Sequence, residues 1–143
     1  MRLLFIALLL AGIAVAQNPG YQQDARWHSP AEAVARPNPL VTRPEATAGG
    51  HKLFVRNCAE CHGPDGSGME KKHSADFQLP FVQAQTDGTL FWKITNGNPS
   101  HGMPSFSKLP ELQRWQLVLY IRSLKGTAVD SGAQAGKPIS QAQ

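Results

Sequence analysis

Two cysteines and a histidine stand together at Cys58, Cys61 and His62, in the pattern C-x-x-C-H. This spacing is typical of covalent attachment of a c-type haem. Two thiols one helical turn apart reach the two vinyl groups of one porphyrin, and the adjacent imidazole then becomes the proximal iron ligand through one ring nitrogen. We expect a backbone carbonyl at or near Pro80 to bind the other nitrogen. The motif predicts one covalently bound haem c.

Other uses of the two cysteines remain open. A thioredoxin-like pair needs a strand-to-helix setting, and no convincing strand is predicted here. A zinc site built from both cysteines and two histidines would leave the long loops and an apolar C-terminal helix unexplained. Its histidines would come from His62, His73 and His101. A disulfide across C-x-x-C closes too small a loop to stabilise a fold much. Haem attachment is the use of the cysteines that also accounts for the long loops and the apolar C-terminal helix.

The iron of an electron-transfer haem takes a second axial ligand, and a thioether there favours ferrous iron and raises the reduction potential. Met103 is the candidate, because Gly102 and Pro104 flank it in a loop that can approach the haem face and is stiff afterwards. His101 is the rival ligand. Met69 follows the C-x-x-C-H motif so closely that its chain would have to turn round the porphyrin edge at once.

Three helices separated by long loops are expected to position these residues. Helices are predicted over residues 48–59, 87–96 and 111–125. The first has Gly50, Leu53, Phe54 and Asn57 on one face. The third is apolar nearly all round, so it must be covered on more than one side. The predicted end signals are Thr47 before the first helix, Thr86 or Asp87 and Gly97 around the second, and Pro110 and Gly126 around the third.

The ends of the chain differ in composition from the middle. Residues 1–16 carry a positive start, an apolar run and a small-x-small ending, which predicts a signal peptide and export to the bacterial periplasm. That run covers only about 21 Å as a helix, so no stable membrane span is expected after cleavage. Residues 17–45 contain five prolines and predict an extended arm. Residues 127–143 predict a disordered low-complexity tail, which leaves residues 46–126 as the folded unit.

Composition narrows the classes of function. The 143 residues carry a formal net charge of +4, which is too weak and dispersed to argue for nucleic acid binding. A hydrophobic fraction of 41% excludes wholesale disorder, and two cysteines exclude a disulfide-dense scaffold. No Gly-rich phosphate loop of known spacing is present. We therefore expect a small exported domain completed by a cofactor.

Residues 46–126 resemble a class I monohaem cytochrome c of the small bacterial type. The resemblance implies an all-α cytochrome c fold, with about three main helices and long loops wrapped around one covalently bound haem. It implies Cys58 and Cys61 as thioether anchors and His62 and Met103 as axial ligands. Pro110 departs from the family, in which a serine or similar cap often starts the last helix. The matching segments are Gly50 with Phe54, Cys58–Gly63, Asp65–Gly68, Thr89–Gly97, Gly102–Pro104 with Phe106, and Leu117 with Tyr120.

The resemblance implies an electron carrier rather than an enzyme, with redox proteins as partners. No acid–base pair is recognisable, since His51, His73 and His101 have no carboxylate at a suitable spacing. A dedicated cytochrome subunit of a dehydrogenase or oxidase complex is an alternative to a diffusible carrier. A haem protein with an open sixth position that binds a small gas is a third hypothesis, against which Met103 argues.

Overall fold

The computed structural model describes residue 21 and residues 23–126, so the predicted leader and tail lie outside the described residues. In this part of the chain the secondary structure is helical, with one isolated antiparallel bridge between Asn98 and Met103 and no strand. The helices are α1 (Ala31–Val34), α2 (Ala46–Asn57), α3 (Ala59–His62), α4 (Pro80–Gln83), α5 (Asp87–Asn96) and α6 (Glu111–Ser123), with 3-10 turns η1 (Glu70–Lys72) and η2 (Pro99–His101).

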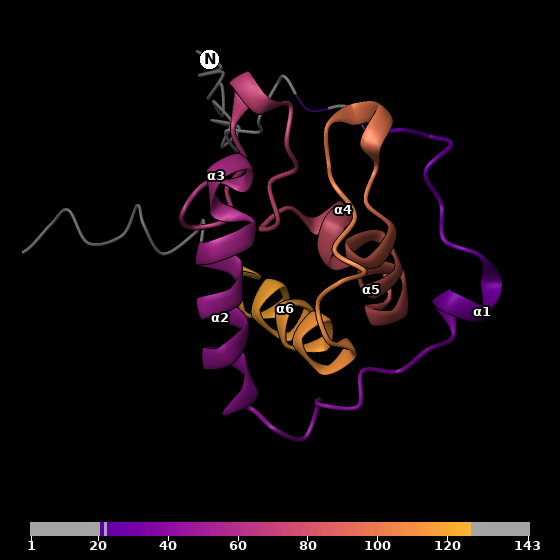
Figure 1. The fold of residues 1–143 in the computed structure, drawn as a ribbon, viewed down its shortest axis with the longest axis vertical. Helices are drawn as coiled ribbons and strands as arrows, with labels where there is room; N and C mark the ends of the chain where they lie inside the picture. Colours follow the sequence, from indigo (N-terminus) through magenta and orange to yellow (C-terminus); the bar gives the residue numbers. More distant parts are fainter. Residues whose placement is uncertain (1–20, 22, 127–143) are drawn as a thin grey trace, which may run out of the picture.

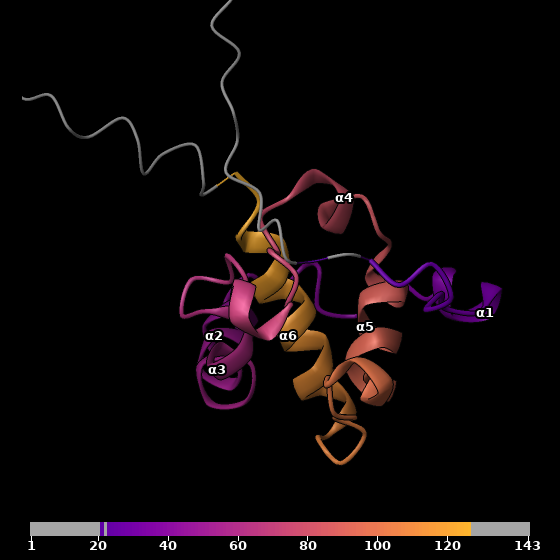
Figure 2. The same cartoon turned by 90° about the horizontal axis from the view of Figure 1, so that it is seen from above.

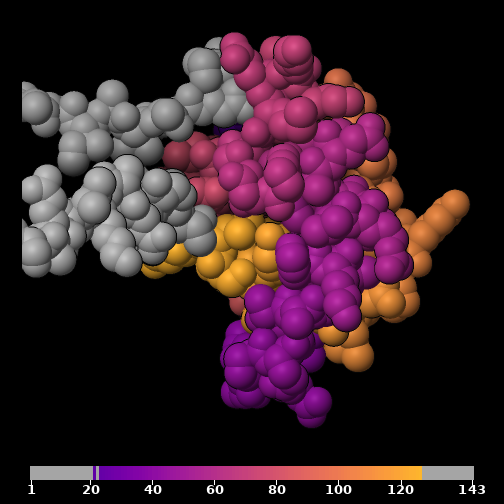
Figure 3. Space-filling view, turned by 90° about the vertical axis from the view of Figure 1, so that its left-hand side faces the viewer, coloured from indigo at the N-terminus to yellow at the C-terminus, as the bar shows by residue number. Residues whose placement is uncertain are grey.

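The helix α6 lies between the other two long helices. It packs against α2 on one side and α5 on the other (Figures 1 and 2). Figure 3 shows α2 and α3 forming the outer surface on one side, with part of α6 exposed beside them. The all-helical prediction with three main helices is confirmed, and α6 is covered on more than one side as expected. The core consists of Leu53, Phe54, Val82, Leu90, Phe91, Ile94, Trp115, Leu117, Val118 and Ile121.

The helix α5 begins and ends where the sequence predicts. The Thr86 hydroxyl accepts a hydrogen bond from the Thr89 N–H at 3.1 Å, so Thr86 caps the first turn. Gly97 ends the helix with φ of +66°, a conformation that glycine adopts without strain. Local signals decide both ends of this helix.

The other two long helices differ from their predictions at the ends. The helix α2 starts at Ala46, so Thr47 lies inside its first turn and is not the cap. The turn that follows Pro44 leads directly into the helix, because the Thr47 N–H donates to the Pro44 carbonyl at 3.1 Å. At the far end, α6 stops at Ser123, earlier than predicted, and Pro110 precedes it as the N-cap residue without a side-chain cap.

The close crossing of α2 and α6 depends on Gly50. A Cβ atom at this position would lie 2.0 Å from the backbone oxygen of Gln116, far inside van der Waals contact. Leu53 and Phe54 continue the same face into the core. The predicted inner face of this helix is confirmed for Gly50, Leu53 and Phe54, whereas Asn57 is half-buried.

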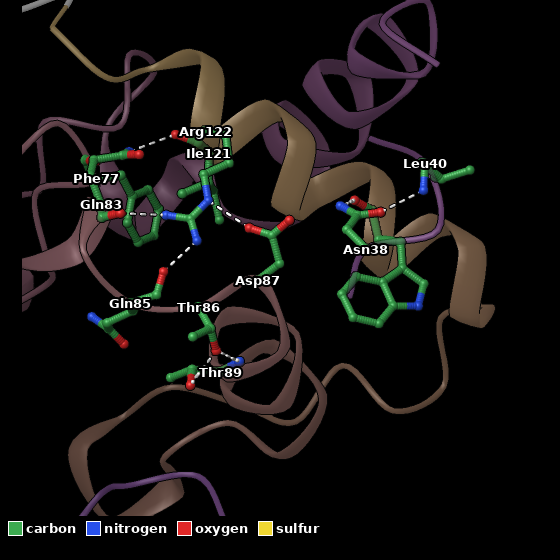
Figure 4. A network of polar contacts seen from close by, with 11 residues as sticks. Asn38, Leu40, Phe77, Gln83, Gln85, Thr86, Asp87, Thr89, Ile121 and Arg122 are labelled. Atoms are coloured by element: carbon green, nitrogen blue, oxygen red, sulfur yellow. Dashed lines mark hydrogen bonds and ion pairs between the residues drawn. The ribbon is translucent and has the colours of Figure 1, made fainter. Parts of the chain in front are cut away.

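A polar network ties the end of α6 to the segment between α4 and α5 (Figure 4). The Arg122 guanidinium donates to Asp87 Oδ1 at 2.7 Å, to the Gln83 carbonyl at 2.8 Å and to the Gln85 carbonyl. The Gln83 amide in turn donates to the Ile121 carbonyl at 2.8 Å. The bonds from Arg122 satisfy the carbonyls of Gln83, at the end of α4, and of Gln85, in the segment after it. Within the described residues, no helix combines the length and apolar content needed to cross a membrane.

The crossing predicts a sharp difference between two adjacent glycines. Gly50→Ala should lower the free energy of unfolding by about 2–3 kcal/mol, because its methyl group meets backbone that cannot yield without moving a helix. Gly49→Ala is the matched control: its Cβ would meet only the flexible end of the Gln116 side chain, at 2.9 Å. Its unfolding free energy should change by less than about 1 kcal/mol. Urea unfolding followed by circular dichroism measures both, and equal effects would contradict the proposed crossing constraint.

Candidate functional site

The C-x-x-C-H motif lies at the end of α2 and along α3. The backbone breaks from helical geometry at Cys58, with φ of −121°, and then resumes a single turn. The His62 N–H donates to the Cys58 carbonyl at 2.9 Å, and the Cys61 N–H donates to the same carbonyl at 3.1 Å. Residues three apart on one turn share a face, so the two thiols lie on the same side of the chain. Both are free and half-buried.

The environment makes the Cys58 thiol unreactive in its free form. Burial raises the pKa of Cys58 to about 12, and the neighbouring Cys61 adds to the shift. The thiolate is the form that binds metal ions and attacks disulfides. A protonated, half-buried thiol at Cys58 therefore argues against a redox-active C-x-x-C pair.

His62 is held in one orientation by two contacts. Its Nδ1–H donates to the Ala75 carbonyl at 3.1 Å, which leaves Nε2 available as a ligand. Its ring stacks on Phe77, with centroids 4.3 Å apart. Burial lowers the pKa of His62, so the ring is neutral and can offer a lone pair. The carbonyl expected near Pro80 is that of Ala75, five residues earlier.

The loop after α3 folds back onto the motif. The Gly68 N–H donates to the His62 carbonyl at 2.8 Å, and the Phe77 N–H donates to the Gly66 carbonyl at 2.8 Å. The buried Ser74 hydroxyl donates to the Cys61 carbonyl and accepts from the Met69 N–H at 2.8 Å. Ser74 and Ala75 were not predicted as contributors, because their roles follow from the path of the loop and not from residue type.

Met103 lies in a braced loop that follows α5. Its N–H donates to the Asn98 carbonyl at 3.1 Å and its carbonyl accepts from the Asn98 N–H at 2.8 Å. Beyond it, the Phe106 N–H donates to the Ile94 carbonyl at 3.2 Å, which returns the chain to α5. The Met103 side chain is half-buried, whereas that of Met69 is 37% exposed.

The structure gathers three of the four predicted site residues on one helical turn and places Met103 on a different segment. Figures 1 and 2 show α3 and the loop after α5 as separate segments. Phe77, from the loop after α3, and Phe106, from the loop after α5, are half-buried and pack against the core. Two thiols, a neutral imidazole with a free nitrogen, a thioether and these apolar side chains fit a haem group.

The zinc alternative requires further ligands beside the motif. Within the described residues, no group of three or more His, Cys, Asp or Glu side chains is arranged to hold a metal ion, so the zinc alternative has no ligand cluster. His101 is exposed and lies 3.6 Å from the carboxylate of Asp24. Asp24 is distant from His101 in sequence, so the spacing of residues does not reveal this pair.

Residues 45–121 match the protein family described as "Cytochrome C oxidase, cbb3-type, subunit III". The chain is 32% identical over 108 residues to the cbb3-type cytochrome c oxidase subunit CcoP of Azospirillum sp. (strain B510). It is 34% identical over 103 residues to the cbb3-type cytochrome c oxidase subunit FixPc of Rhizobium leguminosarum bv. viciae. Each match covers 66% of this chain but only 36% of the relative, so the chain spans about a third of their length.

Among solved structures, the chain is similar to a c-type cytochrome, KustC0563. The two are 31% identical, and the superposition has a TM-score of 0.49. It covers 53% of this chain and 96% of the other.

The geometry of the loop that holds Met103 predicts unequal effects at its two glycines. A Cβ at Gly97 would lie 2.4 Å from the Pro104 carbonyl oxygen, on a backbone with φ of +66°. Gly97→Ala should therefore lower the free energy of unfolding by about 3 kcal/mol. Gly102→Ala is the control, because φ is +82° there but nothing lies within 4 Å of the added Cβ. Its cost should be about 1 kcal/mol, from backbone strain alone. Chemical unfolding measures both, and a larger loss at Gly102 would contradict this packing.

Proposed function

The chain belongs to the family of cbb3-type cytochrome c oxidase subunit III, a family of c-type cytochrome domains, and we propose that it transfers electrons through one covalently attached haem. The observation that carries the proposal is the arrangement of α3. Two free thiols and an imidazole share one helical turn, and the imidazole keeps Nε2 free because Nδ1–H is donated to Ala75. No other use of C-x-x-C-H explains that combination as well.

Four residues would hold the group. Cys58 and Cys61 would form thioether bonds to it, and His62 and Met103 would supply the two ligands to its iron. The support for Met103 over Met69 is its half-buried position in a loop closed by paired backbone hydrogen bonds. His101 is exposed and engaged with Asp24, which disfavours it as the ligand. Bound in this way, haem supplies an iron centre that gains and loses one electron.

The protein contributes rigidity to this function. Ala75 and Phe77 fix the plane of the His62 ring, so the ring has little freedom to turn between oxidation states. The Asn98–Met103 pairing restrains the distal residue in the same way. Ligands that stay in place make electron transfer a change of charge with little rearrangement. A thioether from Met103 would favour the reduced form of the haem.

Two settings for this activity remain distinct proposals. In the first, the leader directs export and the protein is a periplasmic carrier between redox proteins. In the second it is a dedicated cytochrome subunit of an oxidase complex, which is favoured by the names of its relatives from Azospirillum and Rhizobium. Affinity purification from membranes solubilised in mild detergent distinguishes the two. Stoichiometric recovery of oxidase subunits favours the second setting, and recovery of the cytochrome alone favours the first.

The distal ligand is tested by Met103→Ala. The variant should retain covalent haem, bind carbon monoxide in the reduced state and show a reduction potential lower by on the order of 0.1 V or more, because the thioether no longer stabilises ferrous iron. Redox titration followed by absorbance measures the potential. Met69→Ala is the matched control and should leave the potential unchanged. An unchanged potential in Met103→Ala, or a fall in Met69→Ala alone, would remove Met103 from the ligand set.

Covalent attachment is tested by the double variant with Cys58→Ala and Cys61→Ala. Haem should be lost on acid–acetone extraction, because the variant has no thiol to form a thioether bond. The unmutated protein and Met103→Ala should both keep haem on the polypeptide in a denaturing gel stained for haem peroxidase activity. Haem that stays on the double variant would demand another point of attachment.

A further inference from the structure

Residues 24–40 form a strap that lies outside the segment matched by the family, residues 45–121. We call this segment the N-terminal strap. Figure 1 shows it running down beside α5 to α1, before the chain crosses to the start of α2. Figure 2 shows α1 beside α5 from a second direction, and the two helices are in contact. The strap therefore covers α5, the helix that leads into the loop with Met103.

The strap is fastened to the helical core along its length. Asn38 is buried, and its amide donates to the Trp115 carbonyl in α6 at 3.2 Å. Ala33 approaches α5 so closely that a Cβ at Gly88 would lie 1.8 Å from the Ala33 carbonyl oxygen. The Ser29 and Thr89 hydroxyls lie 2.9 Å apart. These contacts make the strap a fixed part of the fold rather than a loose arm.

The first residues of the strap reach the loop that holds Met103. The Trp27 indole N–H donates to the Gly97 carbonyl at 3.0 Å. The Lys93 ammonium lies 4.6 Å from the centre of the Trp27 ring, which holds the ring against α5. Asp24 accepts from the Asn98 side-chain amide at 3.4 Å. The strap thus contacts two consecutive residues at the start of the loop.

Gly97 and Asn98 set the path of the loop that holds Met103. The Gly97 N–H already donates to the Lys93 carbonyl at 2.8 Å, so the bond from Trp27 restrains the glycine on its carbonyl side as well. Asn98 is buried, and its backbone pairs with Met103 in both directions. A glycine at a helix end is the natural hinge for such a loop. Trp27 and Asp24 brace that hinge from outside.

We propose that Trp27 and Asp24 are positioning residues that hold Met103 at the haem by bracing the start of its loop. The inference rests on the proposed ligation by Met103, to which it adds a device supplied by the strap. Neither residue touches the iron. They make it rarer for the loop to move away from the haem, and so lower the rate at which an external ligand replaces the thioether.

The test uses the full haem-loaded protein and the rate at which imidazole binds its ferric form. At saturating imidazole this rate equals the rate at which the methionine ligand leaves. Trp27→Phe removes the hydrogen bond but keeps a ring for Lys93, and it should raise the limiting rate about fivefold, as expected for one ordinary hydrogen bond. Asp24→Ala, at a position only partly buried, provides a second variant and should also raise the rate.

Ser29→Ala is the matched control, because it removes a contact between the strap and α5 without touching the loop. It should leave the limiting rate unchanged, and guanidinium unfolding of all variants separates loop opening from loss of global stability. Unchanged rates in both Trp27→Phe and Asp24→Ala would overturn the inference, as would an equal rise in Ser29→Ala.

The unmutated ferric protein separates this inference from the proposed function. The weak long-wavelength band of thioether-ligated ferric haem should be present. Its absence would overturn Met103 ligation and the bracing together. Its presence with unaltered rates in both variants would overturn the bracing alone.

Discussion

The contact between α2 and α6 at Gly50 is the constraint on which the rest of the structure depends. The two backbones approach there as closely as a missing side chain allows, with the Gln116 carbonyl in the space a Cβ would occupy. This fixes the line of α2, and because α3 follows after a break at Cys58, it also fixes where the two thiols and His62 lie. One glycine therefore places most of the proposed haem site relative to α6.

Met103, the other proposed iron ligand, is positioned from the opposite side of α6. The helix α5 packs against α6 and ends at Gly97, where the loop with Met103 begins. The two predicted iron ligands thus belong to separate segments whose relation is set through α6. The Arg122 network and the N-terminal strap add polar contacts that fasten α5 to this frame. A small domain with long loops gains rigidity from such links where its core is limited.

The sequence predicts those features that local chemistry decides. Both ends of α5 are predicted correctly, because the signals from Thr86 and Gly97 act within a single turn. Gly50 is predicted on the inner face of its helix, and the structure adds that its missing side chain permits the close crossing with α6. The predicted start of α2 is wrong, because a turn after Pro44 leads into the helix without a side-chain cap. The carbonyl of Ala75 cannot be predicted, since any residue offers one and only the path of the loop selects it. The bond from Trp27 to Gly97 joins residues 70 apart, and no local pattern encodes it.

The most direct test of the central claim is an absorption spectrum of the exported, haem-matured protein, taken oxidised, then reduced, then exposed to carbon monoxide. Ligation by His62 and Met103 predicts sharp low-spin bands on reduction, a weak long-wavelength thioether band when oxidised and no response to carbon monoxide. Rapid carbon monoxide binding would contradict it, because the sixth position would then be open and the protein would be a ligand-binding haem protein. The absence of a haem spectrum would contradict haem attachment itself.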